Sequence, residues 1–269
     1  MGKKAIIVGA RKSQLSLTQT NHVISILKSS FPDHEFALKT ISTAGDRSMD
    51  HAALFNHQGI FVKEIEEALL RGEIDLGVHS LKDMPCDIRE GLELGAVSVR
   101  EDPRDAFLSK DGVRFRDLKA GARVGTSSVR RRAQVLLSRP DLQVCEMRGN
   151  VDTRLRKLVS GEVDALVIAC AGIVRLGQEK LITERMPLDI MLPAPCQGAL
   201  ALEIRQGDTH LKLVVQAFDH APTRVAITAE RSFLKNLGGG CSLPVGAFAQ
   251  VEAGTLTLTG QVVDPGGKK

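Results

Sequence analysis

A single cysteine on a glycine-rich loop is the side chain best placed to do chemistry in this sequence. Cys241 lies in the run from Gly238 to Pro244, directly after a helix predicted over Thr223 to Leu237. A thiol presented on a flexible loop can carry a covalent group. The same glycines can also simply end the helix, and free cysteines are commonly buried and inert. Both interpretations of Cys241 remain open on this segment alone.

A second candidate is an anion site at a predicted helix N-terminus. The segment Gly125 to Arg131 combines backbone N–H groups, three hydroxyl side chains and two adjacent arginines. The dipole of a helix favours negative charge at this end. The segment Arg148 to Arg154 adds two more arginines. An ordinary Ser/Thr cap with solvated arginines is the alternative interpretation.

A third candidate is the turn His79 to Pro85, which follows a predicted buried strand. We expect Lys82 and Asp83 to face a cleft, where a carboxylate can act as acid, base or stabiliser of a cation. The alternative is a solvated Lys/Asp pair beside a core histidine. The sequence contains neither a His-Glu-x-x-His motif nor a Gly-x-x-x-x-Gly-Lys-Ser/Thr motif, so we expect no metal or nucleotide site.

Bulk composition indicates a folded protein of two or three domains. The chain has 269 residues, of which 43% are hydrophobic. The apolar segment Ala5 to Val8 is too short for a signal peptide or a membrane span, so we expect a cytoplasmic protein without a membrane partner. Five cysteines without a Cys-x-x-Cys pair argue against a disulfide framework or a zinc site.

Positive charge is concentrated in one part of the chain. The formal net charge is +4, but the stretch from Arg114 to Lys157 contains twelve Lys or Arg against four acids. A nucleic acid is one candidate partner for such a stretch. Proteins that bind single strands usually stack bases on aromatic rings, and this chain has no Trp and no Tyr. The arginines are also set in Gly/Ser/Thr turns, which favours a small or oligomeric carboxylate or phosphate ligand and no nucleic acid.

Two halves of the sequence repeat the same pattern. A strand, a tight turn and a helix begin at Ala5 and again at Arg123, and the segment Arg71 to Val78 resembles Ser160 to Val167. The pattern predicts two related α/β lobes, with ligands at the carboxyl ends of mostly parallel strands. We expect lobe 1 over residues 1–99 and 198–217, lobe 2 over 104–193, chain crossings near 100–104 and 193–198, and a small C-terminal domain over 220–269.

Together, these motifs resemble the porphobilinogen deaminase (hydroxymethylbilane synthase) family over nearly the whole chain. The resemblance implies an α/β fold, with two lobes like type II periplasmic binding proteins, mixed and mostly parallel sheets, and a small α+β C-terminal domain. It also implies a transferase of heme and other tetrapyrrole biosynthesis that condenses four porphobilinogen molecules with loss of ammonia. The motifs are Arg11/Ser13, Phe61 to Glu64, His79 to Pro85, Arg100 to Ala106, Gly125 to Arg131, Arg148 to Arg154, Cys196 to Gly198 and Gly239 to Cys241.

The resemblance also implies a role for each matching residue. Cys241 would hold a dipyrromethane cofactor by a thioether, and Asp83 would be the catalytic carboxylate that stabilises positive charge near the pyrrole nitrogens. The cofactor would contact Lys82, Ser80, Thr126, Ser127, Ser128, Arg130, Arg131, Arg148 and Gly149. Porphobilinogen would contact Arg11, Ser13, Phe61, Arg154, Arg175 and Gln197.

The sequence departs from the family pattern in two places. Leu54 and Gln58 stand where the family usually has lysines, and the chain stops at Lys269, where relatives continue through another strand and a helix. We expect the shortened C-terminal domain to leave an apolar sheet face uncovered and to lower stability. The resemblance suggests a monomer. A non-catalytic two-lobed protein that binds small anions and leaves Cys241 unmodified remains the alternative.

Overall fold

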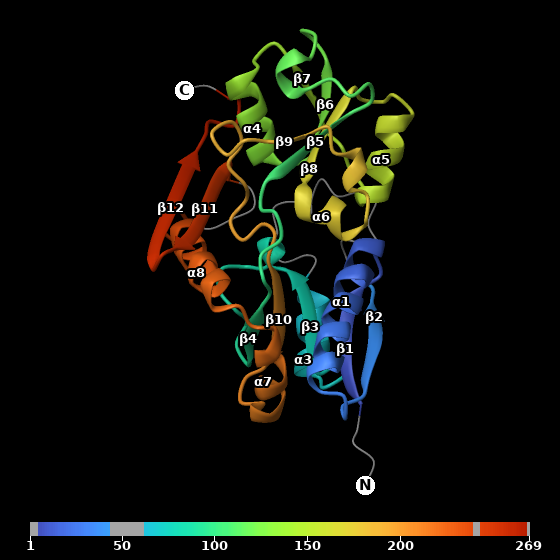
Figure 1. The fold of residues 1–269 in the computed structure, drawn as a ribbon, viewed down its shortest axis with the longest axis vertical. Helices are drawn as coiled ribbons and strands as arrows, with labels where there is room; N and C mark the ends of the chain where they lie inside the picture. The colour runs from blue at the N-terminus through green and yellow to red at the C-terminus, as the bar shows by residue number, and fades with distance from the viewer. Residues whose placement is uncertain (1–4, 44–61, 239–242, 268–269) are drawn as a thin grey trace. The chain divides into compact units, whose positions relative to one another are not determined.

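The computed structural model describes residues 5–43, 62–238 and 243–267. The chain separates into two compact units, which we describe individually (Figure 1). Unit 1 comprises Met1–Arg100 and Ala199–Thr228, and unit 2 comprises Glu101–Gly198 and Ala229–Lys269. The boundary near the C-terminus falls within one helix, α8 (Ala221–Asn236).

Unit 1 is built on a five-stranded sheet in the order β2-β1-β3-β10-β4. Strand β1 is parallel to β2 and β3, whereas β10 is antiparallel to β3 and β4, so four strands run in one direction. The chain returns to this first sheet with β10, directly after Ala199. The strands are β1 (Ile6–Arg11), β2 (Phe36–Ile41), β3 (Leu76–Ser80), β4 (Leu92–Val97) and β10 (Leu200–Arg205).

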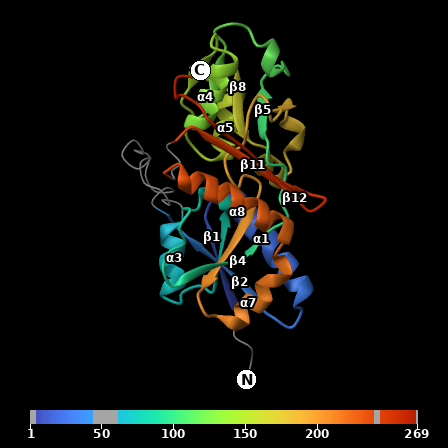
Figure 2. The ribbon, with the colours of Figure 1, turned by 90° about the vertical axis from the view of Figure 1, so that its left-hand side faces the viewer.

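Helices cover both faces of this sheet (Figure 2). Apolar residues of α1 (Gln14–Ser30) and α7 (Thr209–Val215) pack on one face, together with Phe218 of the 3-10 turn η5 (Gln216–Phe218). The helix α3 (Lys63–Leu70) packs on the other face through Ile65 and Leu69. A short 3-10 turn, η2 (Leu81–Asp83), follows β3 directly.

Unit 2 contains a second five-stranded sheet, in the order β7-β6-β8-β5-β9. Strand β6 is parallel to β7 and β8, and β5 is antiparallel to β8 and β9. The strands are β5 (Asp105–Ser109), β6 (Arg123–Gly125), β7 (Gln143–Cys145), β8 (Ala165–Ala169) and β9 (Glu184–Arg185).

The helices of unit 2 again lie on both faces. Val135 of α4 (Val129–Ser138) belongs to one apolar cluster, while Leu158 of α5 (Val151–Val159) and Ile173 of α6 (Cys170–Arg175) belong to the other. Two 3-10 turns, η3 (Phe115–Asp117) and η4 (Glu179–Leu181), lie in the connections.

The two sheets share one topology, which confirms the predicted α/β fold with mixed, mostly parallel sheets and two related lobes. The repeated sequence segment has the same role in each. Asp75 accepts a hydrogen bond from Ile7 N at 2.9 Å, and Asp164 accepts one from Arg123 N at 2.7 Å. Each carboxylate therefore ties the start of a central strand, β3 or β8, to its parallel neighbour, β1 or β6.

The C-terminal segment is a helix followed by a two-stranded antiparallel sheet, as the predicted small α+β domain requires. β11 (Val245–Glu252) pairs with β12 (Thr255–Val262), and the Phe233 ring of α8 occupies the place that a side chain at Gly260 would need. Leu256 and Leu258 on β12 are exposed. No helix in the described residues is long and apolar enough to cross a bilayer.

Candidate functional site

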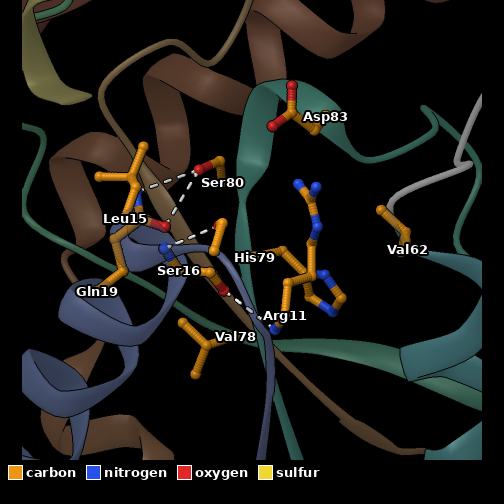
Figure 3. A pocket seen from close by; sticks show the side chains of 10 residues that line it. Arg11, Leu15, Ser16, Gln19, Val62, Val78, His79, Ser80 and Asp83 are labelled. Atoms are coloured by element: carbon orange, nitrogen blue, oxygen red, sulfur yellow. Dashed lines mark hydrogen bonds between the residues drawn. The ribbon is translucent and has the colours of Figure 1, made fainter. Parts of the chain in front are cut away.

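Unit 1 has a pocket at the carboxyl ends of β1 and β3 (Figure 3). Arg11 ends β1, Ser80 ends β3, and Asp83 lies on the turn η2 that follows. All three side chains line the pocket. The remaining lining residues are Ser13, Leu15, Ser16, Gln19, Val62, Val78 and His79.

Hydroxyl side chains fix the pocket wall. Ser13 is the N-cap of α1 and accepts a hydrogen bond from Ser16 N at 3.3 Å, while Ser16 Oγ accepts one from Arg11 N at 3.1 Å. Gln19 Nε2 donates to Ser80 Oγ at 3.2 Å, which joins α1 to the end of β3. Lys82 lies on the same turn as Asp83 but is not a lining residue of this pocket.

In unit 2, the hydroxyls at the entrance of α4 are bonded to the protein itself. Ser128 is the N-cap and accepts from Arg131 N at 3.4 Å, and Thr126 Oγ1 accepts from Ser128 N at 3.2 Å. Ser127 Oγ donates to Met147 O. The Ser/Thr cap of the alternative interpretation is therefore present.

The two arginines of the same segment, however, are buried rather than solvated. Arg130 is 4% exposed and Arg131 is 6% exposed, and both bind Asp105, the first residue of β5, which is fully buried. Arg130 Nη1 donates to Asp105 Oδ2 at 2.7 Å, and Arg131 Nη2 donates to Oδ1 at 2.7 Å. Gln197 Nε2 donates to the same Oδ1 at 2.8 Å. One carboxylate thus holds two guanidinium groups.

The electrostatics of this cluster leave an excess of positive charge. Burial alone would raise the pKa of Asp105, but Arg130 and Arg131 outweigh burial and hold that pKa well below its usual range. Burial lowers the pKa of Arg130, with Asp105 opposing the change. The Nε of Arg130 has no hydrogen bond partner within the described residues. Two guanidinium groups against one carboxylate leave the cluster with net positive charge, which suits an anionic ligand.

The other predicted cationic residues lie on loops and helices of unit 2. Arg154 Nε donates to Gly149 O at 2.8 Å, and Gly149 has a φ of 112°, a conformation that favours glycine. Arg148 pairs with Glu146 at 2.7 Å. Arg175 ends α6 and donates to Gly198 O at 2.6 Å; burial lowers the pKa of Arg175 to about 10, against the influence of Glu101.

The structure therefore brings the predicted residues together in three groups. Arg11, Ser13, Ser80 and Asp83 share the pocket of unit 1. Within unit 2, Gln197 joins Arg130 and Arg131 at Asp105, and Arg154 contacts Gly149 next to Arg148. The predictions for Phe61 and Cys241, and the departures at Leu54 and Gln58, lie outside the described residues.

The prediction from sequence missed Asp105 and the buried glutamine Gln134. Gln134 Nε2 donates to Leu192 O at 3.0 Å, and its Oε1 accepts from Leu192 N at 2.7 Å, so it secures the chain crossing before Gln197. The sequence contained one signal for Asp105. This acid directly precedes the apolar residues Ala-Phe-Leu of a strand, where an ionised side chain needs a buried partner. Within the described residues, no group of three His, Cys, Asp or Glu side chains is placed to hold a metal ion.

These features define a class of protein: two α/β lobes of one topology, with cationic and hydroxyl side chains at the carboxyl ends of their strands. Two family models match the sequence. The model of the porphobilinogen deaminase dipyromethane cofactor binding domain matches residues 6–213, and the model of the porphobilinogen deaminase C-terminal domain matches residues 225–269. The chain belongs to the porphobilinogen deaminase family.

Relatives match over nearly the whole chain. The porphobilinogen deaminase of Brevibacillus brevis is 50% identical over 264 residues, which cover 97% of this chain and 85% of the relative. The porphobilinogen deaminase of Thermus thermophilus is 50% identical over 266 residues, which cover 98% and 87%. Among solved structures, the BvgS VFT2 domain of Bordetella pertussis is 16% identical, with a TM-score of 0.46 and coverage of 85% and 92%.

Proposed function

We propose that this chain is a transferase that condenses four porphobilinogen molecules head to tail, with release of ammonia, to give hydroxymethylbilane for heme and other tetrapyrroles. Family membership supports this activity. The observation that carries the proposal for this chain is the pocket of unit 1, which combines a carboxylate, Asp83, with a guanidinium group, Arg11, at the ends of two adjacent strands.

The dipyrromethane cofactor fits the residues of unit 2. Its acetate and propionate groups are anions, and the cluster of Arg130, Arg131 and Asp105 has net positive charge and an unpartnered Arg130 Nε among the described residues. When bound, the cofactor supplies the pyrrole to which new units are joined. We propose a thioether to Cys241, with further contacts from Lys82, Ser80, Thr126, Ser127, Ser128, Arg130, Arg131, Arg148 and Gly149.

Porphobilinogen brings one acetate and one propionate to the enzyme, so its binding also needs cations. We propose that Arg11 and Ser13 bind it in the pocket of unit 1, with Arg154, Arg175, Gln197 and Phe61 as further substrate contacts. Backbone contacts of Arg154 and Arg175 with Gly149 and Gly198 orient these two guanidinium groups, which reduces the entropy lost on binding.

In this proposal, Asp83 stabilises the positive charge that develops during the reaction. Positive charge develops on the pyrrole as ammonia leaves porphobilinogen, and a fixed carboxylate lowers the energy of that transition state. The turn η2 places Asp83 directly after β3, where the sheet holds its backbone in position. Ser80, bonded to Gln19, fixes the same strand end.

Mass spectrometry of the intact protein tests the proposal. The protein purified from cells should carry the mass of two pyrrole units, and Cys241→Ala should lose that mass. Purified protein given porphobilinogen should release ammonia and form hydroxymethylbilane. A bare protein without turnover would instead support a non-catalytic protein that binds small anions.

We further propose that the enzyme works as a monomer in the cytoplasm and binds no nucleic acid. Gel filtration would test the monomer, and retention on DNA at low salt would test nucleic acid binding.

A further inference from the structure

Three ionisable side chains are buried together in unit 1, on β3, β10 and α3. Glu203 is 0% exposed, His79 is 5% exposed and Glu66 is 8% exposed. His79 Nε2 lies 3.1 Å from Glu203 Oε2. Neither oxygen of Glu203 has a hydrogen bond partner among the described residues. Burial of a carboxylate with so little compensation is unfavourable, so the presence of Glu203 needs an explanation other than stability.

The second lobe shows what the same scaffold contains at these positions. Glu203 pairs with Gly77 in the first sheet, and Leu108 pairs with Leu166 in the second. Gly77 and Leu166 both follow the first residue of the central strand, β3 or β8. Glu203 therefore corresponds to Leu108.

The other two members of the group follow from the same register. His79 is the fourth residue of β3, and Ile168 is the fourth residue of β8. The repeated segment contains a Gly-Glu motif in each lobe, Gly72-Glu73 and Gly161-Glu162. Glu66 on α3 and Leu155 on α5 each lie six residues before the glycine of that motif. Leu108 and Ile168 belong to one apolar cluster, against which Leu155 packs. The fold thus accepts three apolar residues where unit 1 buries three ionisable ones.

The position of the group connects it with the pocket. His79 lines the pocket together with Arg11, Ser80 and Asp83 (Figure 3). Glu203, on β10, is not a lining residue of the pocket but lies 3.1 Å from the imidazole of His79, which connects it with the pocket. Glu203 is an ionisable residue at a position where the other lobe has an apolar one, and it contacts a histidine that lines the pocket. This combination points to a role in the reaction.

Charged side chains lie around this buried group. Burial and the charge of Glu203 raise the pKa of Glu66, while His79 and Arg89 oppose the rise. Arg89 Nη1 is 3.7 Å from Glu66 Oε2. Arg205, on the same strand as Glu203, is bound to Asp75 and to the carbonyls of Leu69 and Ile74. His79 is thus the basic group that the structure places against Glu203.

We propose that Glu203 is a positioning residue for the reaction in this pocket, acting through His79. Its carboxylate decides which ring nitrogen of His79 carries a proton and how the imidazole faces the pocket. Glu66, whose pKa is raised by burial and by the charge of Glu203, is the third member of the buried group and adds a limb to the pH profile. This inference rests on the proposed function of the pocket.

An apolar triple variant tests the inference. Glu203→Leu, His79→Ile and Glu66→Leu together reproduce the residues of the second lobe. We expect this variant to carry the cofactor mass and to unfold at the same or a higher temperature than the unmodified protein. Its kcat should fall at least about tenfold, and the pH dependence of kcat/KM should lose one limb. Unchanged kcat with an unchanged pH profile, or failure to fold, would overturn the inference.

A single substitution keeps the test independent of the triple variant. Glu203→Gln preserves the shape of the side chain, and Glu73→Gln makes the same chemical change on the surface of unit 1, where Glu73 is 43% exposed. Only Glu203→Gln should lower kcat and move the pH profile; equal behaviour of both variants would refute the inference. If the unmodified protein forms no hydroxymethylbilane, the proposed function itself fails, which is a distinct result.

Discussion

The two lobes of this protein share a scaffold but not the chemistry placed on it. Asp75 and Asp164 make the same hydrogen bond in their lobes, because that contact belongs to the strand-helix-strand pattern. After the central strand, unit 1 has Asp83 on a 3-10 turn, whereas the corresponding residue of unit 2 is Gly172 on α6. Residues that both lobes share thus maintain the fold, and residues that differ are the candidates for function.

The lobes also differ in the partner of their buried acid. In unit 1, Glu203 lies against His79, whose imidazole lines the pocket. In unit 2, Asp105 is held by Arg130 and Arg131, which stay charged. Unit 2 thus places two guanidinium groups against its buried acid, whereas unit 1 places an imidazole against its buried acid.

Removal of the Asp83 carboxylate in unit 1 should have the largest effect, and that effect should be on the reaction rate. In Asp83→Asn, the rate of hydroxymethylbilane formation should fall by about a thousandfold, because the fixed negative charge near the reacting pyrrole is lost. The cofactor mass and the unfolding temperature should remain normal, since Asp83 is only partly buried. Turnover within tenfold of normal would contradict a catalytic role for Asp83. The proposed chemical difference between the lobes would then have no support from Asp83.

Removal of the buried acid in unit 2 should act on stability instead. Asp105→Asn should lower the free energy of unfolding by about 3–5 kcal/mol, because two buried guanidinium groups lose their common counter-charge. Urea unfolding measures the change. A loss below about 1 kcal/mol would show that the cluster does not depend on Asp105.

The same carboxylate predicts a pH dependence. The pKa of Asp105 is lowered in the folded protein, so its contribution is fully present above the unfolded pKa of about 3.9 and is lost progressively as the pH falls below that value. Urea unfolding between pH 7 and pH 3 should show a smaller decline for Asp105→Asn than for the unmodified protein. Parallel declines would contradict this assignment.

The shared aspartates should give smaller and similar effects. Asp75→Asn and Asp164→Asn each weaken a charged hydrogen bond to a backbone N–H and an ion pair, with Arg205 or Arg123, and both side chains are partly exposed. We expect each to cost about 1 kcal/mol, discounted for solvent screening. Differential unfolding in urea compares the two variants. A large loss in one lobe only would show that the repeated motif is not equivalent.

The helix caps should show the smallest difference between lobes. Ser13→Ala and Ser128→Ala each remove a side-chain acceptor from a helix N-terminus, which typically costs about 0.5–2 kcal/mol. Thermal unfolding of both variants provides the measurement. A cost well above this range at Ser128 alone would indicate that its neighbours Arg130 and Arg131 depend on the cap.

Local patterns in the sequence were sufficient to predict much of the fold. Two α/β lobes were predicted from the alternation of apolar strands and helices and from the repeated Gly-Glu motif. Both signals involve residues close together in the sequence, so they can be recognised without the structure. The pocket residues Arg11, Ser80 and Asp83 could also be predicted, since they follow predicted strands directly. Parallel strands bring such positions to the same edge of a sheet.

Contacts between distant parts of the chain could not be predicted in this way. The pairing of Asp105 with Arg130 and Arg131 depends on β5 lying beside β8, and that of His79 with Glu203 depends on the register between β3 and β10. Neither register is encoded in the local sequence. The buried partners of these ionisable groups therefore became visible only in the folded chain.

The place of β10 in the first sheet has a consequence for synthesis on the ribosome. This strand lies between β3 and β4, although both precede it by a whole lobe in the sequence. The five strands of the second sheet, by contrast, follow one another without interruption. During translation, the lobe made first therefore waits with an open gap in its sheet while the lobe made second already has all its strands, so chaperones would meet the early lobe in an unfinished state.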